Sequence, residues 1–193
     1  VALPLDADLE AAVGIGYSGL EVYGIHALEL YQWHVERRRG GETGVKRVRC
    51  LRGDEMWKAV DSGLVSREAL DAAFAATTKP ANADYRKDDK AALFLFDYVD
   101  GFQGAVFMLS CAHGTSVGLK FKGGAAVGMP TVATAFDERA EPRFPHFAYL
   151  LKAIERMIHT GKPPYPVERT LLTSGVLDRA MRSHAQHGAT LET

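Results

Sequence analysis

The stretch AALFLFDYVDGFQGAVFMLS, residues 91–110, decides the fold class of this chain. It holds two runs, 91–99 and 102–110, that are rich in aromatic and aliphatic residues and are separated by Asp100-Gly101. An Asp-Gly pair between two such runs is the strongest short-range signal of a β-hairpin. The runs are apolar at consecutive positions rather than at alternate ones, which is typical of strands covered on both faces. The stretch therefore predicts a buried pair of antiparallel strands.

The sequence around this hairpin extends it into a sheet. Residues 115–123 and 130–136 are short and rich in residues that favour strands, and residues 45–51 alternate as a half-buried strand does. Short links join the strands between residues 91 and 136, so we expect an antiparallel meander rather than parallel strands connected by crossovers.

Helices are predicted before and after this block of strands. They cover residues 20–39, 55–63, 67–77, 146–161 and 167–184. The helix over 146–161 has an apolar stripe made of Phe147, Leu150, Leu151, Ile154, Met157 and Ile158. This order of elements predicts an α+β fold, in which an open antiparallel β-sheet has its helices packed on one face.

Composition places the chain among ordinary globular proteins and predicts a single domain over residues 1–193. Hydrophobic residues make up 47% of the chain and charged residues 24%, with a net charge of −1. This near-neutral balance creates no strong field, so we expect no nucleic-acid partner and no membrane partner. No apolar run reaches the roughly 18 residues of a membrane span, and the N-terminus lacks a secretory signal. We expect a cytoplasmic protein, and a piece of a longer one because no initiator Met is present.

The two cysteines, Cys50 and Cys111, each lie in an apolar, strand-like run. Neither belongs to a Cys-x-x-Cys motif or to another recognisable catalytic signature. We therefore expect two buried free thiols rather than a disulfide or a nucleophile.

Three glycines near the start, Gly14-x-Gly16-x-x-Gly19, have the spacing of a dinucleotide-binding fingerprint. A working fingerprint follows a buried strand, and an acid ends a second strand about twenty residues further on. Here DADLEAAV, residues 6–13, carries three acids, and the turn GGETG, residues 40–44, stands where the second strand would end. We therefore predict that these glycines form a tight turn leading into the helix over 20–39, and not a nucleotide site.

The segment GKPPYPVERTLLTSG, residues 161–175, resembles the end of proteins of the glucose-fructose oxidoreductase/inositol dehydrogenase/MocA family. Residues 146–181 continue this resemblance, and residues 16–57 resemble one branch of the family, so nearly the whole chain is covered. The resemblance implies an α+β C-terminal domain like that of dihydrodipicolinate reductase, which serves for substrate binding and oligomerisation. It also implies that the N-terminal Rossmann domain is absent from this chain. NAD or NADP is implied for a full-length parent, and no cofactor is expected to bind this chain alone.

Members of this family carry Gly-x-His-x-x-Asp on the first long helix of the domain, where the substrate meets the nicotinamide. The matching residues here are Gly24, His26 and Glu29, with Glu in place of Asp. The resemblance implies that His26 and Glu29 are catalytic, because a histidine is suited to take the proton of a substrate hydroxyl. They are three residues apart and therefore neighbours on a helix surface, so Glu29 is expected to orient His26. The alternative, which the spacing alone favours, is a core histidine satisfied by Glu29 and the backbone.

Further candidates for substrate binding are Glu21, Tyr23 and Gly24, in or beside the matched motif, and His146 and Arg169, each near the start of a later helix. His146 also has a structural reading, as a residue of the helix cap. Tyr23 lies three residues before His26 and has a hydroxyl suited to a polyol. Arg169 also has a structural reading, as the partner of an acid at the start of a helix. His-x-x-Glu can present two metal ligands on one helix face, but no further spacing supports a third, and we expect no metal.

Two functions remain open at this stage. The first is the substrate domain of an NAD(P)-dependent oxidoreductase that acts on a small sugar or polyol-like molecule and is inactive without its cofactor domain. The second is a stand-alone, non-catalytic module of the same fold that serves dimerisation or ligand binding. Because one face of an open sheet must be hidden, we expect a homodimer through that face.

Overall fold

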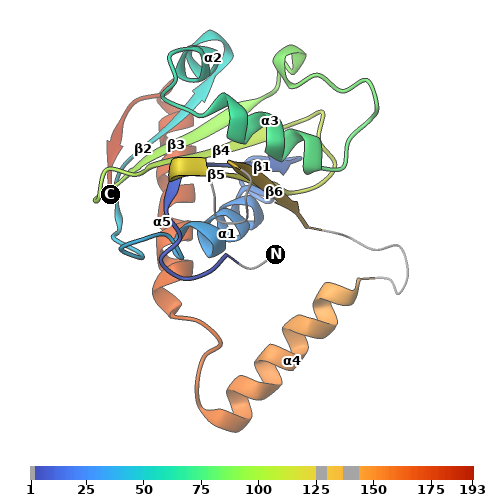
Figure 1. The fold of residues 1–193 in the computed structure, drawn as a ribbon, viewed down its shortest axis with the longest axis vertical. Coiled ribbons are helices and arrows are strands. Elements are labelled where there is room, and N and C mark those ends of the chain that lie inside the picture. The colour runs from blue at the N-terminus through green and yellow to red at the C-terminus, as the bar shows by residue number, and fades with distance from the viewer. Residues whose placement is uncertain (1–2, 125–129, 137–143) are drawn as a thin grey trace.

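Residues 3–124, 130–136 and 144–193 are described by a computed structural model, shown in Figure 1. In this part of the chain, seven strands form one open sheet in the order β6-β5-β1-β4-β3-β2-β7. The strands are β1 Leu9–Tyr17, β2 Val45–Arg52, β3 Ala92–Tyr98, β4 Gln103–Leu109, β5 Ser116–Phe121, β6 Thr131–Ala135 and β7 Leu191–Glu192. The helices are α1 Gly24–Val35, α2 Gly53–Asp61, α3 Arg67–Ala76, α4 Pro145–Thr160 and α5 Val167–Ala185, with single 3₁₀ turns over Tyr85–Lys87 and Lys122–Gly124. None of the helices in the described residues is long and apolar enough to cross a membrane.

The predicted hairpin at residues 91–110 is confirmed. Strands β3 and β4 pair antiparallel, with Phe94 opposite Val106, and both strands are buried over almost their whole length. Gly101 has a φ of 88°, a left-handed conformation that glycine adopts without strain. The carboxylate of Asp100 accepts a hydrogen bond from the backbone N–H of Phe102 at 3.0 Å, which closes the turn.

The predicted meander is wrong at one point, because β4 and β5 are not neighbours. Strand β1 lies between them, parallel to β4 and antiparallel to β5, so that Ile15 pairs with both Phe107 and Ser116. Strands β5 and β6 do pair antiparallel, as expected. A short link limits how far apart two strands lie, but it does not prevent a third strand from inserting between them. Burial of Val13 and Ile15 stabilises β1 in this central place despite its acidic start.

The glycine motif is not the turn that the sequence predicts, since Gly14 and Gly16 lie inside β1. A Cβ atom on Gly16 would stand 2.6 Å from both the Cβ of Ala27 in α1 and the Sδ of Met108 in β4. A Cβ atom on Gly14 would stand 3.2 Å from the Tyr31 ring. Only glycine permits so close an approach, and both residues pair with β4, so their backbone belongs to the sheet rather than to a phosphate cradle.

The α+β class and the open sheet are confirmed, but the prediction that the helices pack on one face is wrong. Helices α1 and α5 contact one face of the sheet, whereas α2 and α3 contact the other (Figure 1). Strands such as β3 are apolar on both faces, so helices must pack on both faces of the sheet to bury these side chains. Phe94 and Phe96 join the core beneath α1 and α5, while Leu93 and Leu95 join the core beneath α2 and α3.

Helix α4 differs from the other helices in its packing. No residue of α4 is buried, and the helix makes no extensive contact with any other described helix or strand. Figure 1 shows it apart from the sheet and from the helices that cover the sheet. The apolar stripe predicted over 146–161 is therefore present in sequence but exposed in space, with Leu151 65% and Ile158 73% exposed.

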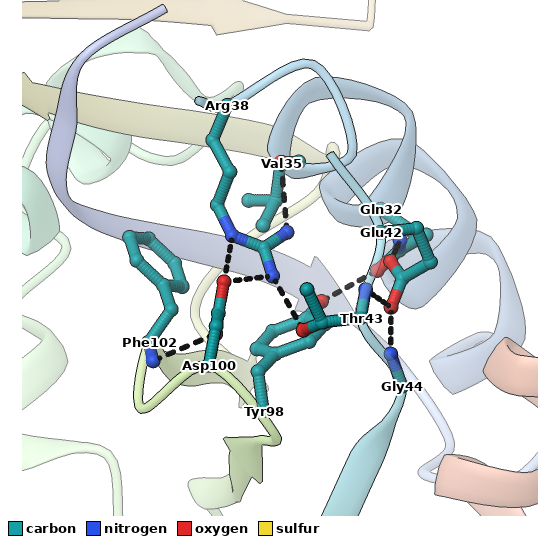
Figure 2. A network of polar contacts seen from close by, with 9 residues as sticks. All are labelled: Gln32, Val35, Arg38, Glu42, Thr43, Gly44, Tyr98, Asp100 and Phe102. Atoms are coloured by element: carbon teal, nitrogen blue, oxygen red, sulfur yellow. Dashed lines mark hydrogen bonds and ion pairs between the residues drawn. The ribbon is translucent and has the colours of Figure 1, made fainter. Parts of the chain in front are cut away.

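Arg38, at the basic end of the first predicted helix, is buried although it is charged. Helix α1 ends at Val35, and the side chain of Arg38 is only 3% exposed. Its guanidinium donates to Asp100 Oδ2 from Nε at 3.0 Å and from Nη2 at 2.8 Å, and to the carbonyl of Val35 at 3.1 Å (Figure 2). It also stacks 4.5 Å from the centre of the Tyr98 ring. Arg38 therefore ties the end of α1 to the β3–β4 hairpin.

Asp100 carries the negative charge that this buried arginine needs. Burial by itself raises the pKa of Asp100, but hydrogen bonds from the Phe102 amide and from Arg38 outweigh burial and hold the pKa below its usual value. Asp100 therefore remains charged in the folded protein to lower pH than in the unfolded chain, and its contribution to stability depends on pH.

The contact of β1 with α1 predicts a clear difference between two glycines of the same motif. Gly16→Ala should lower the free energy of unfolding by about 1–3 kcal/mol, because the new methyl group overlaps Ala27 on a fixed helix. Gly19→Ala is the control, since a Cβ atom there would meet no other atom within 4 Å, and it should change stability by less than about 0.5 kcal/mol. Urea unfolding followed by circular dichroism measures both, and equal stabilities would contradict the packing role of Gly16.

The buried ion pair predicts a pH-dependent loss of stability in Asp100→Asn. The substitution leaves Arg38 without its countercharge and should cost about 2 kcal/mol near neutral pH, less than a fully buried pair because Asp100 is 29% exposed. Since the folded pKa of Asp100 is lowered, the advantage of the parent is present above the unfolded pKa of about 4 and disappears as pH falls through the folded pKa. Urea midpoints of the two proteins should therefore converge below about pH 4. Asp89→Asn, at an exposed carboxylate, is the control, and a gap that stays constant with pH would contradict this assignment.

Candidate active site

His26 lies in the first turn of α1, and its side chain is exposed. The helix starts there because β1 ends at Tyr17 and the turn at Gly19–Tyr23 reverses the chain, with the Tyr23 amide donating to the carbonyl of Gly19 at 3.1 Å. An exposed imidazole is free to meet a substrate or another domain, and it is not the satisfied core histidine of the alternative reading. Its catalytic role stays a prediction.

A row of aromatic rings connects His26 to the end of β1. The ring of Tyr23 stands edge-on to that of His26, with 6.1 Å between ring centres, and it packs against the ring of Tyr17 at 4.8 Å. Tyr23 is half-buried, so its ring is held while the neighbouring imidazole faces outward. The structure therefore brings two of the predicted site residues, His26 and Tyr23, into contact.

Glu29 is not paired with His26. Its carboxylate accepts a hydrogen bond from Thr173 Oγ1 of α5, and within the described residues no hydrogen bond joins it to His26. Thr173 is buried between the two helices, so Glu29 connects α1 to α5. The expectation that Glu29 orients His26 is therefore not met in this geometry.

The other predicted residues around His26 divide into one that is buried and one that is exposed. Gly24 is buried, and a Cβ atom there would stand 3.0 Å from side-chain atoms of both Phe94 and Leu177. Its glycine identity is explained by the packing of α1 between β3 and α5, and not by substrate contact. Glu21 is exposed in the turn that precedes α1.

His146 and Arg169 are not joined to His26 by any hydrogen bond, ion pair or ring contact within the described residues. His146 lies at the start of α4, where its ring packs against Phe147 at 4.4 Å between ring centres. Arg169, in the first turn of α5, forms an ion pair with Glu36 and stacks 4.3 Å from the Tyr165 ring centre. The structural reading of Arg169, as the partner of an acid, is therefore the one the geometry supports.

A pocket of about 440 Å³ opens beside this row of rings, at the carboxyl ends of the parallel strands β1 and β4. Its wall includes Tyr17, so the pocket and His26 adjoin opposite ends of the Tyr17–Tyr23 pair. Ligands of α/β sheets bind outside the carboxyl ends of parallel strands, and the volume suits a small molecule. The lining residues are Tyr17, Ser18, Gly19, Leu20, Arg52, Lys90, Met108, Ser110, Ala112 and His113.

Sequence reasoning missed this pocket because its residues come from four separate segments. Arg52 ends β2, Lys90 precedes β3, and Ser110 follows β4. The signal that could have located them is the common edge at which strands β1, β2 and β4 end. That edge depends on the parallel pairing of β1 with β4, which a predicted meander does not contain.

A buried carboxylate holds the rim of the pocket in place. Asp88 accepts hydrogen bonds from Ser110 Oγ at 2.6 Å, from the amide of Cys111 at 3.0 Å and from the amide of Lys90 at 3.1 Å. Burial opposes its charge, but these hydrogen bonds together lower the pKa of Asp88 below its usual value. The segments that follow β4 and precede β3 are thereby fixed to each other.

The cysteines lack the properties of nucleophiles. Burial raises the pKa of Cys50 to about 11, and burial together with the nearby Asp88 carboxylate raises the pKa of Cys111 to about 11. Both thiols therefore stay protonated near neutral pH. Both are free, as predicted, although Cys111 is only partly buried. Among the described residues, no group of three or more His, Cys, Asp or Glu side chains is arranged to hold a metal ion.

Comparison with known proteins identifies the fold. No protein-family model matches the sequence, and no curated protein matches it. Solved structures do match. A scyllo-inositol dehydrogenase from Lactobacillus casei, with bound NAD(H) and scyllo-inositol, is 11% identical with a TM-score of 0.55, over 97% of this chain and 57% of that one. A myo-inositol dehydrogenase from Corynebacterium glutamicum is 13% identical with a TM-score of 0.53, over 95% and 56%.

A third structure, GenD2 from gentamicin A biosynthesis in complex with NAD, is 12% identical with a TM-score of 0.54, over 96% of this chain and 56% of that one. This chain thus spans slightly more than half the length of each matched structure. Nearly all of this chain is used in each match, as expected for one domain of a longer relative. The chain has the α+β fold of the C-terminal domain of inositol dehydrogenase-like proteins.

Proposed function

We propose that this chain is the substrate domain of an NAD(P)-dependent oxidoreductase that acts on a hydroxyl group of a sugar or polyol-like molecule. The observation that carries the proposal is the exposed His26 at the start of α1. Its ring contacts Tyr23, and Tyr23 in turn contacts Tyr17, which lines the pocket at the ends of β1 and β4. Structures of the same fold include enzymes named as inositol dehydrogenases, some with bound NAD(H). This supports the reaction class without identifying the substrate.

The chemistry that His26 supplies is proton transfer. Oxidation of an alcohol removes a proton from the hydroxyl group and a hydride from its carbon. A neutral imidazole accepts such a proton near neutral pH, and its exposed ring leaves room for the substrate on the side away from Tyr23. NAD or NADP, held by a domain outside this chain, takes the hydride when it is bound. Alone, the 193 residues are expected to be inactive.

The exposed face of α4 supports the presence of a second domain. Its six apolar side chains recur at helical spacing and lie on one face of a helix that contacts no other described element extensively. A lone exposed helix of this length gains little stability from its own hydrogen bonds and needs packing. We propose that the cofactor domain covers this face, because this chain spans only slightly more than half of each matched structure.

The alternative function is a non-catalytic dimerisation or ligand-binding module of the same fold. The homodimer through the open sheet stays a prediction, but α2 and α3 cover the face on which it was expected. An apolar surface available to a second copy is instead the one on α4. The pocket beside Tyr17 would serve a module that only binds a ligand as well as it serves an enzyme.

Replacing His26 tests the proposed reaction. In the protein that contains the cofactor domain, His26→Ala should lower kcat by about 100-fold or more, since general-base catalysis contributes on that order. The free energy of unfolding should change by less than about 0.5 kcal/mol, because the side chain is exposed. Steady-state NAD(P) reduction and urea unfolding give the two values.

His184→Ala is the matched control for this experiment, because His184 is a partly exposed histidine in the last turn of α5. It should leave both kcat and stability near those of the parent. Turnover in His26→Ala equal to that of the control would end the catalytic assignment and favour the module.

The apolar face of α4 predicts an effect of polar substitutions on assembly. Leu151→Ser combined with Ile158→Ser should weaken association with a separately produced cofactor domain by about tenfold or more, because two exposed apolar side chains leave the contact. Calorimetric titration measures this association. Lys152→Ser with Arg156→Ser is the control, since these side chains point away from the apolar stripe by helical spacing.

The oligomeric state of the isolated chain shows whether the cofactor domain or a second copy of the chain covers the apolar face of α4. Sedimentation of the parent chain as a monomer, together with loss of domain association in the apolar variant, supports the cofactor domain. A dimer that dissociates when Leu151 and Ile158 are replaced would assign the face to a second copy instead.

A further inference from the structure

We propose that the pocket at the carboxyl ends of β1 and β4 binds an anionic group, a phosphate or a carboxylate, through Arg52 and Lys90. That this group belongs to the substrate rests on the proposed function; that the pocket binds an anion does not. The substrate is then a phosphorylated or carboxylated sugar or polyol rather than an uncharged one.

The backbone holds Arg52 at the pocket. Its Nη2 donates to the carbonyl oxygen of Lys90 at 3.1 Å, and its Nε donates to that of Ala91 at 3.4 Å. Arginine has five N–H donors in a rigid plane, so these contacts orient the guanidinium and leave donors for a ligand. Because Arg52 donates a hydrogen bond to the backbone carbonyl of Lys90, the two cationic residues lie in adjoining parts of the pocket wall.

Within the described residues, neither of these cations is paired with a carboxylate. In the described part of the chain, no carboxylate lies within ion-pair distance of the Arg52 or Lys90 side chain. The pocket between α2, α3 and the sheet is a useful contrast, because Arg67 there pairs with Asp61 at 2.5 Å and Lys120 pairs with Glu10 at 2.9 Å. The cations of the pocket between α2, α3 and the sheet are thus paired with carboxylates, whereas Arg52 and Lys90 have no paired carboxylate among the described residues.

The carboxylate of Asp88, close to Lys90 in sequence, is already occupied by hydrogen bonds. Both oxygens of Asp88 accept hydrogen bonds from the rim, namely from Ser110 Oγ and from two backbone amides, and the residue is 8% exposed. Asp88 thus lowers the positive potential without binding either cationic side chain. The other titratable side chains on the wall are Tyr17 and His113, and neither of them is a carboxylate.

The position of the pocket and its chemistry agree. Strands β1 and β4 run parallel and end there, which is the place where open sheets bind ligands. An arginine and a lysine that line the same pocket match the oxygens of a phosphate or carboxylate better than they match hydroxyl groups alone. The volume of about 440 Å³ accommodates a six-carbon sugar that carries one such group.

Titration of the 193-residue chain tests the site without needing catalysis. Inorganic phosphate, glucose 6-phosphate, gluconate and uncharged glucose are added separately at constant ionic strength, and amide NMR signals are followed. We expect glucose 6-phosphate or gluconate to shift signals of the pocket wall and to bind more tightly than glucose. Whichever of the two binds more tightly identifies the anion as a phosphate or as a carboxylate.

The Arg52→Gln, Lys90→Gln double variant should weaken this binding by about tenfold or more, because both charge-assisted contacts are lost. Lys58→Gln with Lys87→Gln removes the same charge from exposed lysines that pair with Glu55 and Asp84, and should bind as the parent does. Equal binding of glucose and its phosphate, or equal weakening by both double variants, would overturn the proposal.

The outcome is separable from that of the proposed function. Anion binding at the pocket in a protein that never reduces NAD(P) would retain the site and remove the oxidoreductase. NAD(P) reduction that the Arg52 and Lys90 substitutions leave unchanged, together with titrations in which the anions bind no more tightly than glucose, would retain the oxidoreductase and remove the anion site.

Discussion

The close contact between strand β1 and helix α1 is the constraint on which the rest of the structure depends. Gly14 and Gly16 have no side chain on the face toward α1, so Ala27 and Tyr31 can lie directly against the strand. This contact sets the course of the chain as it leaves the sheet, and therefore the place of His26 in the first turn of the helix. At its far end, α1 is secured by Arg38, whose buried guanidinium binds Asp100 in the β3–β4 hairpin (Figure 2).

The insertion of β1 between β4 and β5 decides which strands end at the same edge of the sheet. With β1 parallel to β4, several strands end on the same side of the sheet, and the segments that follow them enclose a pocket. Asp88 holds two of those segments together from within, so the rim is fixed by hydrogen bonds and not by the ligand. The ring of Tyr23 contacts both Tyr17, which lines this pocket, and His26, so the pocket wall and the proposed proton acceptor are connected through two tyrosine rings.

The sheet and helix α4 differ in how completely they are packed. The sheet is covered by helices on both faces, so its two cores are closed within the chain. Helix α4 has the same amphipathic composition but no counterpart, and its apolar side chains face outward. The sheet and the helices on its two faces therefore contain the buried core of the described residues, whereas the apolar face of α4 is exposed. This difference in packing supports a domain that works as part of a larger protein.

Features that depend on residues close together in the sequence were predictable, and features that depend on distant residues were not. The hairpin at Asp100-Gly101, the strands around it and the positions of the helices were predicted, because they depend on turn chemistry and on periodicity within about ten residues. The apolar residues at consecutive positions of β3 even indicated two covered faces, although we assigned the helices to one. The exposed His26 was found only through resemblance to a family, since its spacing from Glu29 favoured a core histidine.

The remaining features depend on contacts between distant segments, and only the tertiary structure decided them. The spacing of Gly14 and Gly16 is the same in a turn and in a strand, and their role became clear only with α1 lying against them. Helix α5 packs beside α1, so Thr173 donates a hydrogen bond to Glu29 and Arg169 forms an ion pair with Glu36. The partners are too far apart in sequence for a local pattern to predict these contacts. The pocket joins residues from four segments through the parallel pairing of β1 and β4. By itself the sequence determined the fold class and most elements, because these are local properties, but it missed the strands β1 and β7. Tertiary packing decided the strand state of β1, the strand order, the faces of the sheet and the site.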